Sequence, residues 1–214
     1  MRLRLLLPCA ALLCGCALLG KNTPVVPRYF TAEYARDAAP AGKHQGLRVR
    51  LGRIEAGTHL RERMAGRRSA RELYFYEERR WSELPEVYLR RALASALFEE
   101  RGLTETEAAQ ALTLEVELLA FEEIDQPHEA RLQALVVLRD GARTLSQETI
   151  TVEQPVASGS PDEARAVAEA LSVSLQRGVK RIADRVLQQL EEAPPQVRPG
   201  GGERPERPAD PSPT

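Results

Sequence analysis

Hydrophobic and polar positions alternate most clearly in the second half of the chain, where they predict β-strands. In residues 111–124, leucine or valine takes every second position from Leu112 to Leu118, with threonine and glutamate between. This period of two is typical of a half-buried strand. Residues 129–140 form a second such segment, which ends in the hairpin-type turn Asp140-Gly141. Residues 144–154 are its expected partner, so this half of the sheet is predicted to be an antiparallel meander.

After residue 160 the period changes, and an apolar residue recurs every three or four positions as far as Leu190. This spacing predicts a helix of about thirty residues with one continuous apolar face. Ser160 is expected to cap its N-terminus, with Pro161 at the first helical position and Glu163 completing a capping box. Most of the apolar face is expected to pack on the sheet, although its outer end can reach a partner.

The first half of the chain mixes the two periods. Residues 28–35, 46–57 and 72–78 predict three further strands. Residues 83–102 predict a helix, because Pro85 suits a first turn and Gly102 suits the position after the last turn. The order of elements indicates an α+β fold, with a mixed, largely antiparallel sheet of about five to six strands covered by two main helices.

The N-terminus has the pattern of a secretory signal, with Arg2 and Arg4 before a short apolar run. The run stops short of the roughly 20 apolar residues that a membrane-spanning helix needs. It ends in LCGC at residues 13–16, which resembles the lipobox of bacterial lipoproteins, with the small Gly15 before the acceptor Cys16. We therefore predict a lipoprotein signal peptide at 1–15 and a lipidated Cys16. The alternatives are an ordinary secretory signal or a buried N-terminal helix.

Removal of residues 1–15 changes both the thiol content and the charge. The three cysteines stand at positions 9, 14 and 16, so the mature chain is expected to have no free thiol, no disulfide and no cysteine nucleophile. The loss of Arg2 and Arg4 leaves 28 cations against 31 anions. Because this balance offers no basic excess to a phosphate backbone, no nucleic-acid partner is expected.

Composition divides the mature chain into three parts. Residues 16–26 are predicted to be a lipidated N-terminal linker, and residues 27–192 a single folded domain. Residues 193–214 contain seven prolines and no aromatic residue. Such a segment cannot bury enough apolar surface to offset its ordering entropy, so a disordered Pro-rich tail is predicted there.

No catalytic motif stands out in the sequence. His44, His59 and His128 lie in different segments without metal-ligand spacing, and no nucleotide-binding or hydrolase motif occurs. The acids of residues 121–125 are expected to be solvated surface. The basic run 59–68 is expected to be a solvated loop or short helix, with contact to anionic lipid or an acidic partner as the alternative. We predict no enzyme activity, no cofactor and no metal.

Residues 72–102 carry the most specific pattern of the chain, namely an aromatic strand, then Arg-Trp, then a proline-started helix. This pattern resembles the ABC-type transport auxiliary lipoproteins. The lipobox and the order of the later strands and helix agree with the resemblance, which covers residues 27–190. The stretch from Arg61 to Arg71 and the long tail depart from it. The matching residues are Tyr74, Tyr76, Arg80, Trp81, Pro85, Leu89, Ala92 and Leu93.

The resemblance implies a small α/β sandwich that serves an MCE-type lipid transport system. The protein would be an outer-membrane lipoprotein facing the periplasm, held in the membrane lipid by acyl chains such as palmitate at Cys16. Ala17 agrees with the outer membrane, since lipoproteins kept at the inner membrane commonly carry Asp there. It would dock on an MCE-domain protein without catalysis, and a ring-shaped homo-oligomer is one arrangement that the resemblance allows. The rival functions are an envelope-assembly or structural lipoprotein and a periplasmic lipid-binding protein with an apolar cavity.

The candidate partner-binding residues are Tyr74, Tyr76, Arg80 and Trp81. Trp81 has two interpretations: packing between the sheet and the first helix, or a place in the partner interface, where Trp, Tyr and Arg dominate binding energy. The two tyrosines are expected to share one face of their strand. Arg80 is the best candidate for a polar anchor to the partner.

Overall fold

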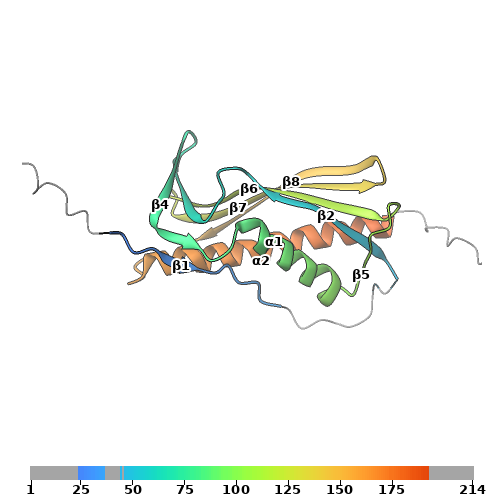
Figure 1. Cartoon of the computed structure of the whole chain (residues 1–214), viewed down its shortest axis with the longest axis horizontal. Helices are drawn as coiled ribbons and strands as arrows, with labels where there is room; N and C mark the ends of the chain where they lie inside the picture. The colour runs from blue at the N-terminus through green and yellow to red at the C-terminus, as the bar shows by residue number, and fades with distance from the viewer. Residues whose placement is uncertain (1–23, 37–43, 45, 193–214) are drawn as a thin grey trace, which may run out of the picture.

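A computed structural model describes residues 24–36, 44 and 46–192 of the chain (Figure 1). The predicted signal peptide 1–15, Cys16, most of the linker 16–26 and the tail 193–214 lie outside these residues. The described strands and helices are, in order, β1 (Arg28–Phe30), β2 (Arg48–Ala56), β3 (Arg63–Ser69), β4 (Glu72–Trp81), α1 (Pro85–Ala94), the π-helix η1 (Ser95–Glu100), β5 (Thr104–Glu105), β6 (Leu112–Ile124), β7 (Glu129–Asp140), β8 (Arg143–Pro155) and α2 (Glu163–Glu192).

The eight described strands form one mixed sheet with β6 at its centre. β7 pairs antiparallel with β6 along its whole length and continues antiparallel into β8, so the predicted meander is present. The other edge of β6 is shared, since β2 pairs parallel with its first half and β3 with its last residues. β5 borders β2, β4 borders β3, and β1 borders β4. The α+β class and the mixed sheet are confirmed, with eight strands in place of five or six.

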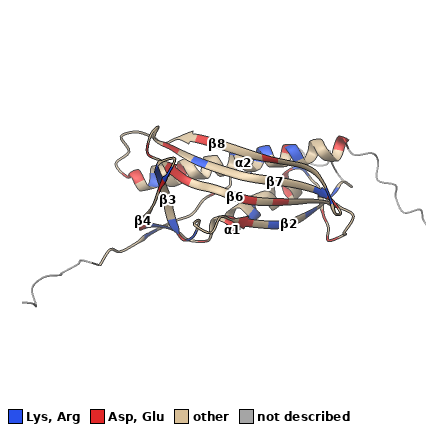
Figure 2. Ribbon diagram, turned by 90° about the horizontal axis from the view of Figure 1, so that it is seen from above, with Lys and Arg blue, Asp and Glu red and all other residues tan. Residues whose placement is uncertain are grey.

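Both main helices cover the same face of the sheet. α2 lies along β7 and β8, and α1 packs beside it over β2. Figure 2 shows the opposite face, which carries acidic and basic residues and no described helix. Gly178 lets α2 approach β7 closely, because a Cβ atom at this position would lie only 2.8 Å from a methyl carbon of Leu132. The structure is therefore two layers thick, with its core between the sheet and the two helices.

The apolar face of α2 forms one side of this core, against β7 and β8. Val167, Leu171, Val179, Ile182 and Val186 follow the predicted spacing, and each has no exposed surface. The facing residues of β7 are the inward members of its alternating pattern, which are all buried. Because burial of one such aliphatic side chain stabilises a fold by about 1.5–3 kcal/mol, this seam is a main source of the stability of the domain.

The beginning of α2 differs from the prediction by two residues. The helix begins at Glu163, and the side chain of Asp162 caps it by accepting a hydrogen bond from the backbone N–H of Arg165 at 3.2 Å. Ser160 instead accepts a hydrogen bond from the N–H of Asp162 in the turn before the helix. The predicted cap at Ser160 was therefore wrong, because the aspartate two residues later is the oxygen that reaches the free amides of the first turn.

The predicted first helix is divided in two. The α-helix ends at Ala94, and the chain continues as η1 to Glu100. Gly102 follows with a φ of +68°, a left-handed conformation that glycine adopts readily at the end of a helix. The stop signal at Gly102 was therefore correct, although the helix changes its hydrogen-bonding pattern before it.

The segment after β1 runs beside α2 and not as a longer strand. β1 contains only three of the eight residues predicted as a strand at 28–35. The side chain of Arg28 forms two hydrogen bonds to the carboxylate of Asp162, at 3.0 and 2.7 Å, and this contact holds the pKa of Asp162 at about 2. Further along, Gln176 donates a hydrogen bond to the carbonyl of Ala35 at 3.1 Å. These contacts tie the N-terminal segment to the C-terminal helix.

The Arg-rich stretch before the aromatic strand is itself a strand, β3, and the expectation of a solvated loop or short helix was wrong. Its centre, from Met64 to Gly66, is buried between β4 and β6, while its arginines lie toward the ends. Gly66 leaves room for the ring of Tyr74 on the neighbouring strand, whose atoms would overlap a Cβ there. Among the described residues, no helix combines the length and the apolar character needed to cross a bilayer.

Candidate functional site

Charged and aromatic side chains from two strands and a turn meet where β3 and β4 join β6. We call this group the Glu123 cluster and define it as Tyr74, Tyr76, Arg79, Glu123, Asp125 and His128. β4 supplies the tyrosines and the arginine, β6 supplies Glu123, and the turn between β6 and β7 supplies Asp125 and His128. The cluster is held together by the parallel pairing of β3 with the end of β6, which brings β4 close to that end.

Glu123 is the centre of the cluster, and only 3 % of its surface is exposed. Its Oε2 atom accepts hydrogen bonds from the hydroxyl of Tyr76 at 2.7 Å and from Arg79 at 3.3 Å. Its Oε1 atom lies 2.8 Å from Nε2 of His128. The guanidinium of Arg79 also lies 3.8 Å from the centre of the Tyr76 ring. Buried charges are stable only when they are paired and hydrogen-bonded, and both conditions are met here.

A second buried ion pair lies one residue earlier on β6. Arg67 donates hydrogen bonds to both carboxylate oxygens of Glu122, at 2.6 and 3.1 Å, and Glu122 is 1 % exposed. The expectation that the acids of residues 121–125 form solvated surface was therefore wrong for Glu122 and Glu123. Both are buried because β3 and β4 bring an arginine to each, from positions more than forty residues earlier in the chain.

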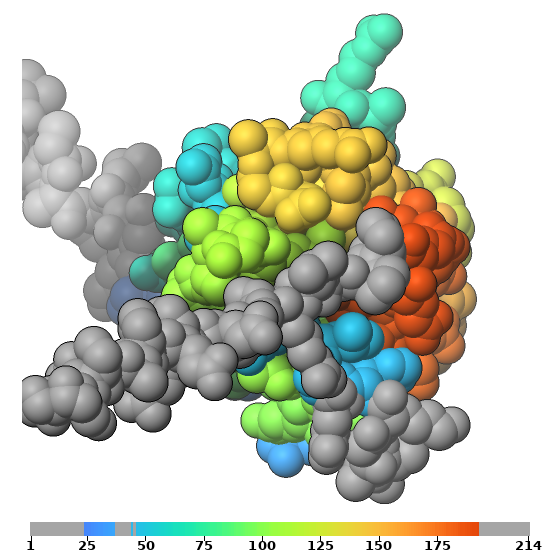
Figure 3. Space-filling view, turned by 90° about the vertical axis from the view of Figure 1, so that its right-hand side faces the viewer, coloured from blue at the N-terminus to red at the C-terminus, as the bar shows by residue number. Residues whose placement is uncertain are grey.

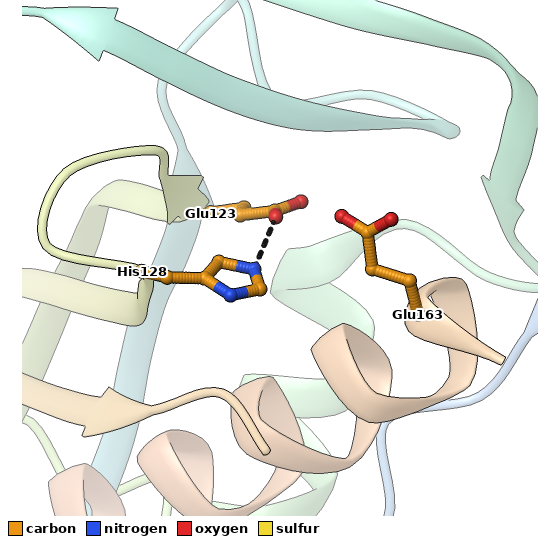
Figure 4. A group of neighbouring side chains, drawn as sticks. All are labelled: Glu123, His128 and Glu163. Carbon is orange, nitrogen blue, oxygen red and sulfur yellow. Dashed lines mark hydrogen bonds and ion pairs between the residues drawn. The ribbon is translucent and has the colours of Figure 1, made fainter. Parts of the chain in front are cut away.

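Figure 4 shows three potential metal ligands that point toward a common space, Glu123, His128 and Glu163 of the first turn of α2. One ligand atom from each lies within 4.8 Å of the others. Both oxygens of Glu123 already bond to donors, however, and Arg79 lies 3.9 Å from the carboxylate of Glu163. A bound cation would face this guanidinium and displace those donors. The donor set therefore fits a network of hydrogen-bonded ions better than a metal centre.

Tyr74 and Tyr76 share one face of β4, as the alternation predicts. Their rings lie 5.1 Å apart in an edge-to-face arrangement, and their hydroxyl oxygens are 2.8 Å apart. Tyr74 donates a hydrogen bond to Asp125 at 2.7 Å. Both side chains are half-buried, and their hydroxyl groups point to the acids of the cluster, Asp125 and Glu123. A partner can therefore reach only part of each side chain.

Trp81, at the end of β4, is 1 % exposed and lies in the core. Its indole stacks on the ring of Phe121 at 5.1 Å and meets the ring of Tyr88 of α1 edge-on at 5.9 Å. This is the position between the sheet and the first helix that the packing interpretation describes.

Arg80 lies on the opposite face of β4 from Arg79 and Trp81, because neighbouring strand residues point to opposite sides. Its side chain is 27 % exposed, and it forms an ion pair with Glu62 at 3.6 Å. The register of β3 and β4 shifts between the pairs Arg63–Arg80 and Ala65–Phe75. The candidates from residues 74–81 therefore divide: the tyrosines face the Glu123 cluster, Trp81 faces the core, and Arg80 faces outward.

A surface hollow of about 610 Å³ lies between the segment after β1 and the outer side of α1 and η1. It is lined partly by alanine and tyrosine and partly by four charged residues, Glu33, Arg36, Arg91 and Glu99. Arg36 and Glu99 form an ion pair at 2.9 Å. The mixture of charged and apolar walls is unlike the apolar cavity that an acyl chain requires.

Residues 31–183 match a family model described as the ABC-type transport auxiliary lipoprotein component. The chain belongs to this family. The matched region runs from the segment after β1 to the middle of α2, so it contains nearly the whole folded domain. The family is described as an auxiliary component of a transport system. None of the curated proteins compared with the chain matches it.

Two solved structures share the fold of this auxiliary lipoprotein. A Xanthomonas campestris protein of the DUF330 family is 17 % identical with a TM-score of 0.66, and the match covers 78 % of this chain and 100 % of that chain. An uncharacterized protein is 12 % identical with a TM-score of 0.60, and the match covers 75 % of this chain and 99 % of that chain. At these identities the likeness establishes the fold alone.

The tyrosine pair makes the auxiliary lipoprotein sensitive to alkaline pH. Burial and a hydrogen bond to Asp125 raise the pKa of Tyr74 from 10.0 to about 12, and burial and the hydrogen bonds with Tyr74 and Glu123 raise the pKa of Tyr76 as well. The native state thus keeps protons that the unfolded chain releases above pH 10. The stability contributed by Tyr74 is complete below pH 10 and is lost as the pH rises toward 12.

We expect Tyr74 and Tyr76 to ionise late when the absorbance of tyrosinate is followed against pH. Tyr74→Phe and Tyr76→Phe should each remove one late group. If all five tyrosines ionise together while the chain is still folded, the described environment of the pair is incorrect.

Sequence reasoning identified the two tyrosines but missed Arg79, Glu123, Asp125 and His128. No local pattern marks these four residues as one group. Glu123 stands in a run of acids that has the composition of a solvated edge, and Arg79 precedes the more conspicuous Arg80-Trp81 pair. The sequence gives one indication of the cluster. β4 carries aromatic residues of a type that is usually buried, while β3 and β6 carry more charged residues than a buried strand usually does.

Proposed function

We propose that this auxiliary lipoprotein is anchored in the outer membrane by a lipidated Cys16, faces the periplasm, and docks on the MCE-domain protein of a lipid transport system. The observation that supports the proposal most strongly is the family match over residues 31–183, joined to the lipobox at residues 13–16. The described chain begins at Pro24, only eight residues after Cys16. An extended chain of that length reaches at most about 29 Å, so the anchor keeps the domain close to the membrane.

The role proposed for the domain is positioning and not chemistry. The groups that come together in the Glu123 cluster are bonded to one another, and none is a nucleophile paired with a free base. We keep Arg80 and the half-buried Tyr74 and Tyr76 as candidates for contact with the MCE-domain protein. Trp81 contributes by packing, since it holds the end of β4 and with it the neighbouring Arg80. The assembly of several copies into a ring is also a proposal.

The rival functions keep the anchor and change the partner. An envelope-assembly or structural lipoprotein would bind a different envelope complex. A periplasmic lipid-binding protein needs an apolar cavity, and the hollow beside α1 is lined by four charged side chains. The described structure therefore favours docking over lipid carriage.

The proposal is tested by capturing the tagged full-length protein from envelopes in mild detergent, with Cys16→Ala beside it. We expect the intact mass of the wild type to show acylation, and an MCE-domain protein to be captured with it. The variant should lose both the acyl mass and membrane attachment, because one lipidated cysteine supplies the whole anchor. An acylated protein that captures a different envelope complex would exclude the MCE partner, and a protein without lipid would exclude the anchor.

Arg80→Ala gives the finer test. An interface arginine at the centre of a contact typically contributes 2 kcal/mol or more, so we expect capture to weaken by about 30-fold. Arg143→Ala, an exposed arginine on β8 with no ion pair to a described residue, is the matched control and should leave capture unchanged. Equal capture by the two variants would remove Arg80 from the docking surface.

A further inference from the structure

The β3–β4 hairpin projects from the domain and carries more positive charge than its surroundings neutralise. Figure 3 shows the hairpin rising beyond the surface formed by β7 and β8. We define the arginine hairpin as residues 61–72, which include the loop before β3 and the turn into β4. It contains five arginines and two glutamates. The surplus is a property of this segment, since the chain as a whole has a formal charge of −1.

The ion pairs of the hairpin show which arginines are available. Its two glutamates are both taken, Glu62 by Arg80 and Glu72 by Arg68. Arg68 also lies 3.7 Å from Asp125.

Three exposed arginines of the hairpin, Arg61, Arg63 and Arg71, form no ion pair with a described residue. Arg61 donates only to the backbone carbonyl of Thr58, at 3.2 Å. Together they leave three guanidinium groups free to meet an external anion.

The position of the hairpin in the domain indicates which anion its free arginines meet. The hairpin and β1 lie at the same end of the domain in Figure 1, and the turn between β7 and β8 lies at the opposite end. β1 pairs with Arg79–Trp81 at the end of β4, and Arg80 in turn pairs with Arg63, so the described start of the chain lies beside the base of the hairpin. The eight residue steps from Cys16 to Pro24 span at most about 29 Å. The arginine hairpin therefore lies on the end of the domain that is tethered to the bilayer.

We propose that the arginine hairpin contacts anionic phospholipid head groups of the leaflet that holds the acyl anchor. This inference rests on the lipidated Cys16 of the proposed function and adds a second membrane contact to it. Guanidinium groups bind phosphate oxygens through paired N–H donors, and each cation near an anionic surface strengthens association about fivefold. The acyl chains prevent escape, and the hairpin sets the orientation of the domain above the membrane.

The test uses the acylated full-length protein in vesicles, with a fluorescent probe on a single introduced cysteine. Ala70→Cys places the probe at the exposed turn of the hairpin, and Ala142→Cys places it at the exposed turn between β7 and β8. The labelling is specific, because Cys16 is acylated and the other two cysteines leave with the signal peptide. Quenching by a nitroxide on the lipid head group reports the distance of each probe from the membrane.

In phosphatidylcholine vesicles that contain phosphatidylglycerol, we expect strong quenching at position 70 and weak quenching at position 142. The quenching at position 70 should fall in pure phosphatidylcholine and at about 1 M salt, where charges are screened beyond roughly 3 Å. Replacing Arg61, Arg63 and Arg71 together by Gln should reduce the quenching at position 70 to the level seen at position 142. Neutralising the exposed arginines 48, 143 and 177, which form no ion pair with a described residue, is the matched control and should leave it unchanged.

The outcomes separate this inference from the function on which it rests. A chain that floats with the vesicles but shows equal, weak quenching at both positions keeps the anchor and overturns the hairpin contact. A chain that does not float overturns the anchor and the contact together. If neutralising the three arginines leaves quenching intact but abolishes capture of the transport partner, the hairpin binds an acidic protein surface and the lipid contact is wrong.

Discussion

Trp81→Ala is expected to destabilise the domain by about 3–5 kcal/mol, the usual cost of removing a fully buried large aromatic side chain. The indole is 1 % exposed and touches the rings of Phe121 and Tyr88, so its removal leaves a cavity between the sheet and α1. It also ends β4 at the point where β1 pairs with that strand. Denaturant unfolding followed by circular dichroism measures the loss, since the variant has no tryptophan left to report by fluorescence.

Two further variants show whether the lost stability results from the lost packing of the indole. Trp81→Phe keeps an aromatic ring against Phe121 and should cost clearly less than the alanine variant. Tyr29→Ala removes an aromatic ring that is 63 % exposed and should change the stability by no more than about 0.5 kcal/mol. A Trp81→Ala domain within about 1 kcal/mol of wild type would contradict the packing role. If Trp81→Phe keeps the stability but loses the partner, the interface interpretation of Trp81 is the correct one.

Glu123→Ala is expected to cost about 3–5 kcal/mol, because it removes the buried counter-ion of Arg79 and leaves this guanidinium only the exposed carboxylates of Glu78 and Glu163, at 3.7 and 3.9 Å. The same change removes the acceptor of the Tyr76 hydroxyl and the partner of His128. Thermal and denaturant unfolding at neutral pH measure the effect. Glu115→Ala is the matched control, since Glu115 is a β6 glutamate paired with Arg139 at a partly exposed position. It should cost at most about 1 kcal/mol, as exposed ion pairs do.

The double variant Glu123→Ala with Arg79→Met separates an unpaired charge from lost packing. Replacing both members of a buried ion pair by apolar groups is often close to neutral, so the double variant should be more stable than Glu123→Ala alone. If the double variant is no more stable than Glu123→Ala alone, the loss of Glu123 does not leave Arg79 as a destabilising unpaired charge. The neighbouring pair of Arg67 and Glu122 lies on the other side of β6 and should behave independently.

The parts of the fold that could be predicted are those in which local pattern and packing agree. The β6–β8 meander and α2 follow from alternation and from a helical apolar face, because each element buries one side against a single layer. β3 could not be predicted, since its run Arg-Met-Ala-Gly-Arg-Arg-Ser contains too few apolar residues to indicate a strand. It is stable because Glu122, 55 residues away from Arg67, supplies the missing counter-charge.

The candidate site was predictable in part for the same reason. Tyr74 and Tyr76 are marked by their spacing on one strand, and that face was assigned correctly. The acids that bind them come from the end of β6 and from the turn after it, and the parallel pairing of β3 with β6 brings them into place. Pairing between strands so far apart in the chain leaves no trace in the local sequence. For this reason the burial of Glu122 and Glu123 was missed.

The attachment of β1 has a mechanical consequence for a domain tethered through its N-terminus. An anchor at Cys16 would pull on β1 from the Arg28 side, along the strand, as the membrane moves. β1 runs parallel to β4, and the segment beyond it is bonded to α2. Such a pull loads the hydrogen bonds to β4 and the Arg28–Asp162 contact together, in shear, and not one after another as in peeling. Tension from the membrane would therefore pass into the sheet and the long helix without first detaching the strand.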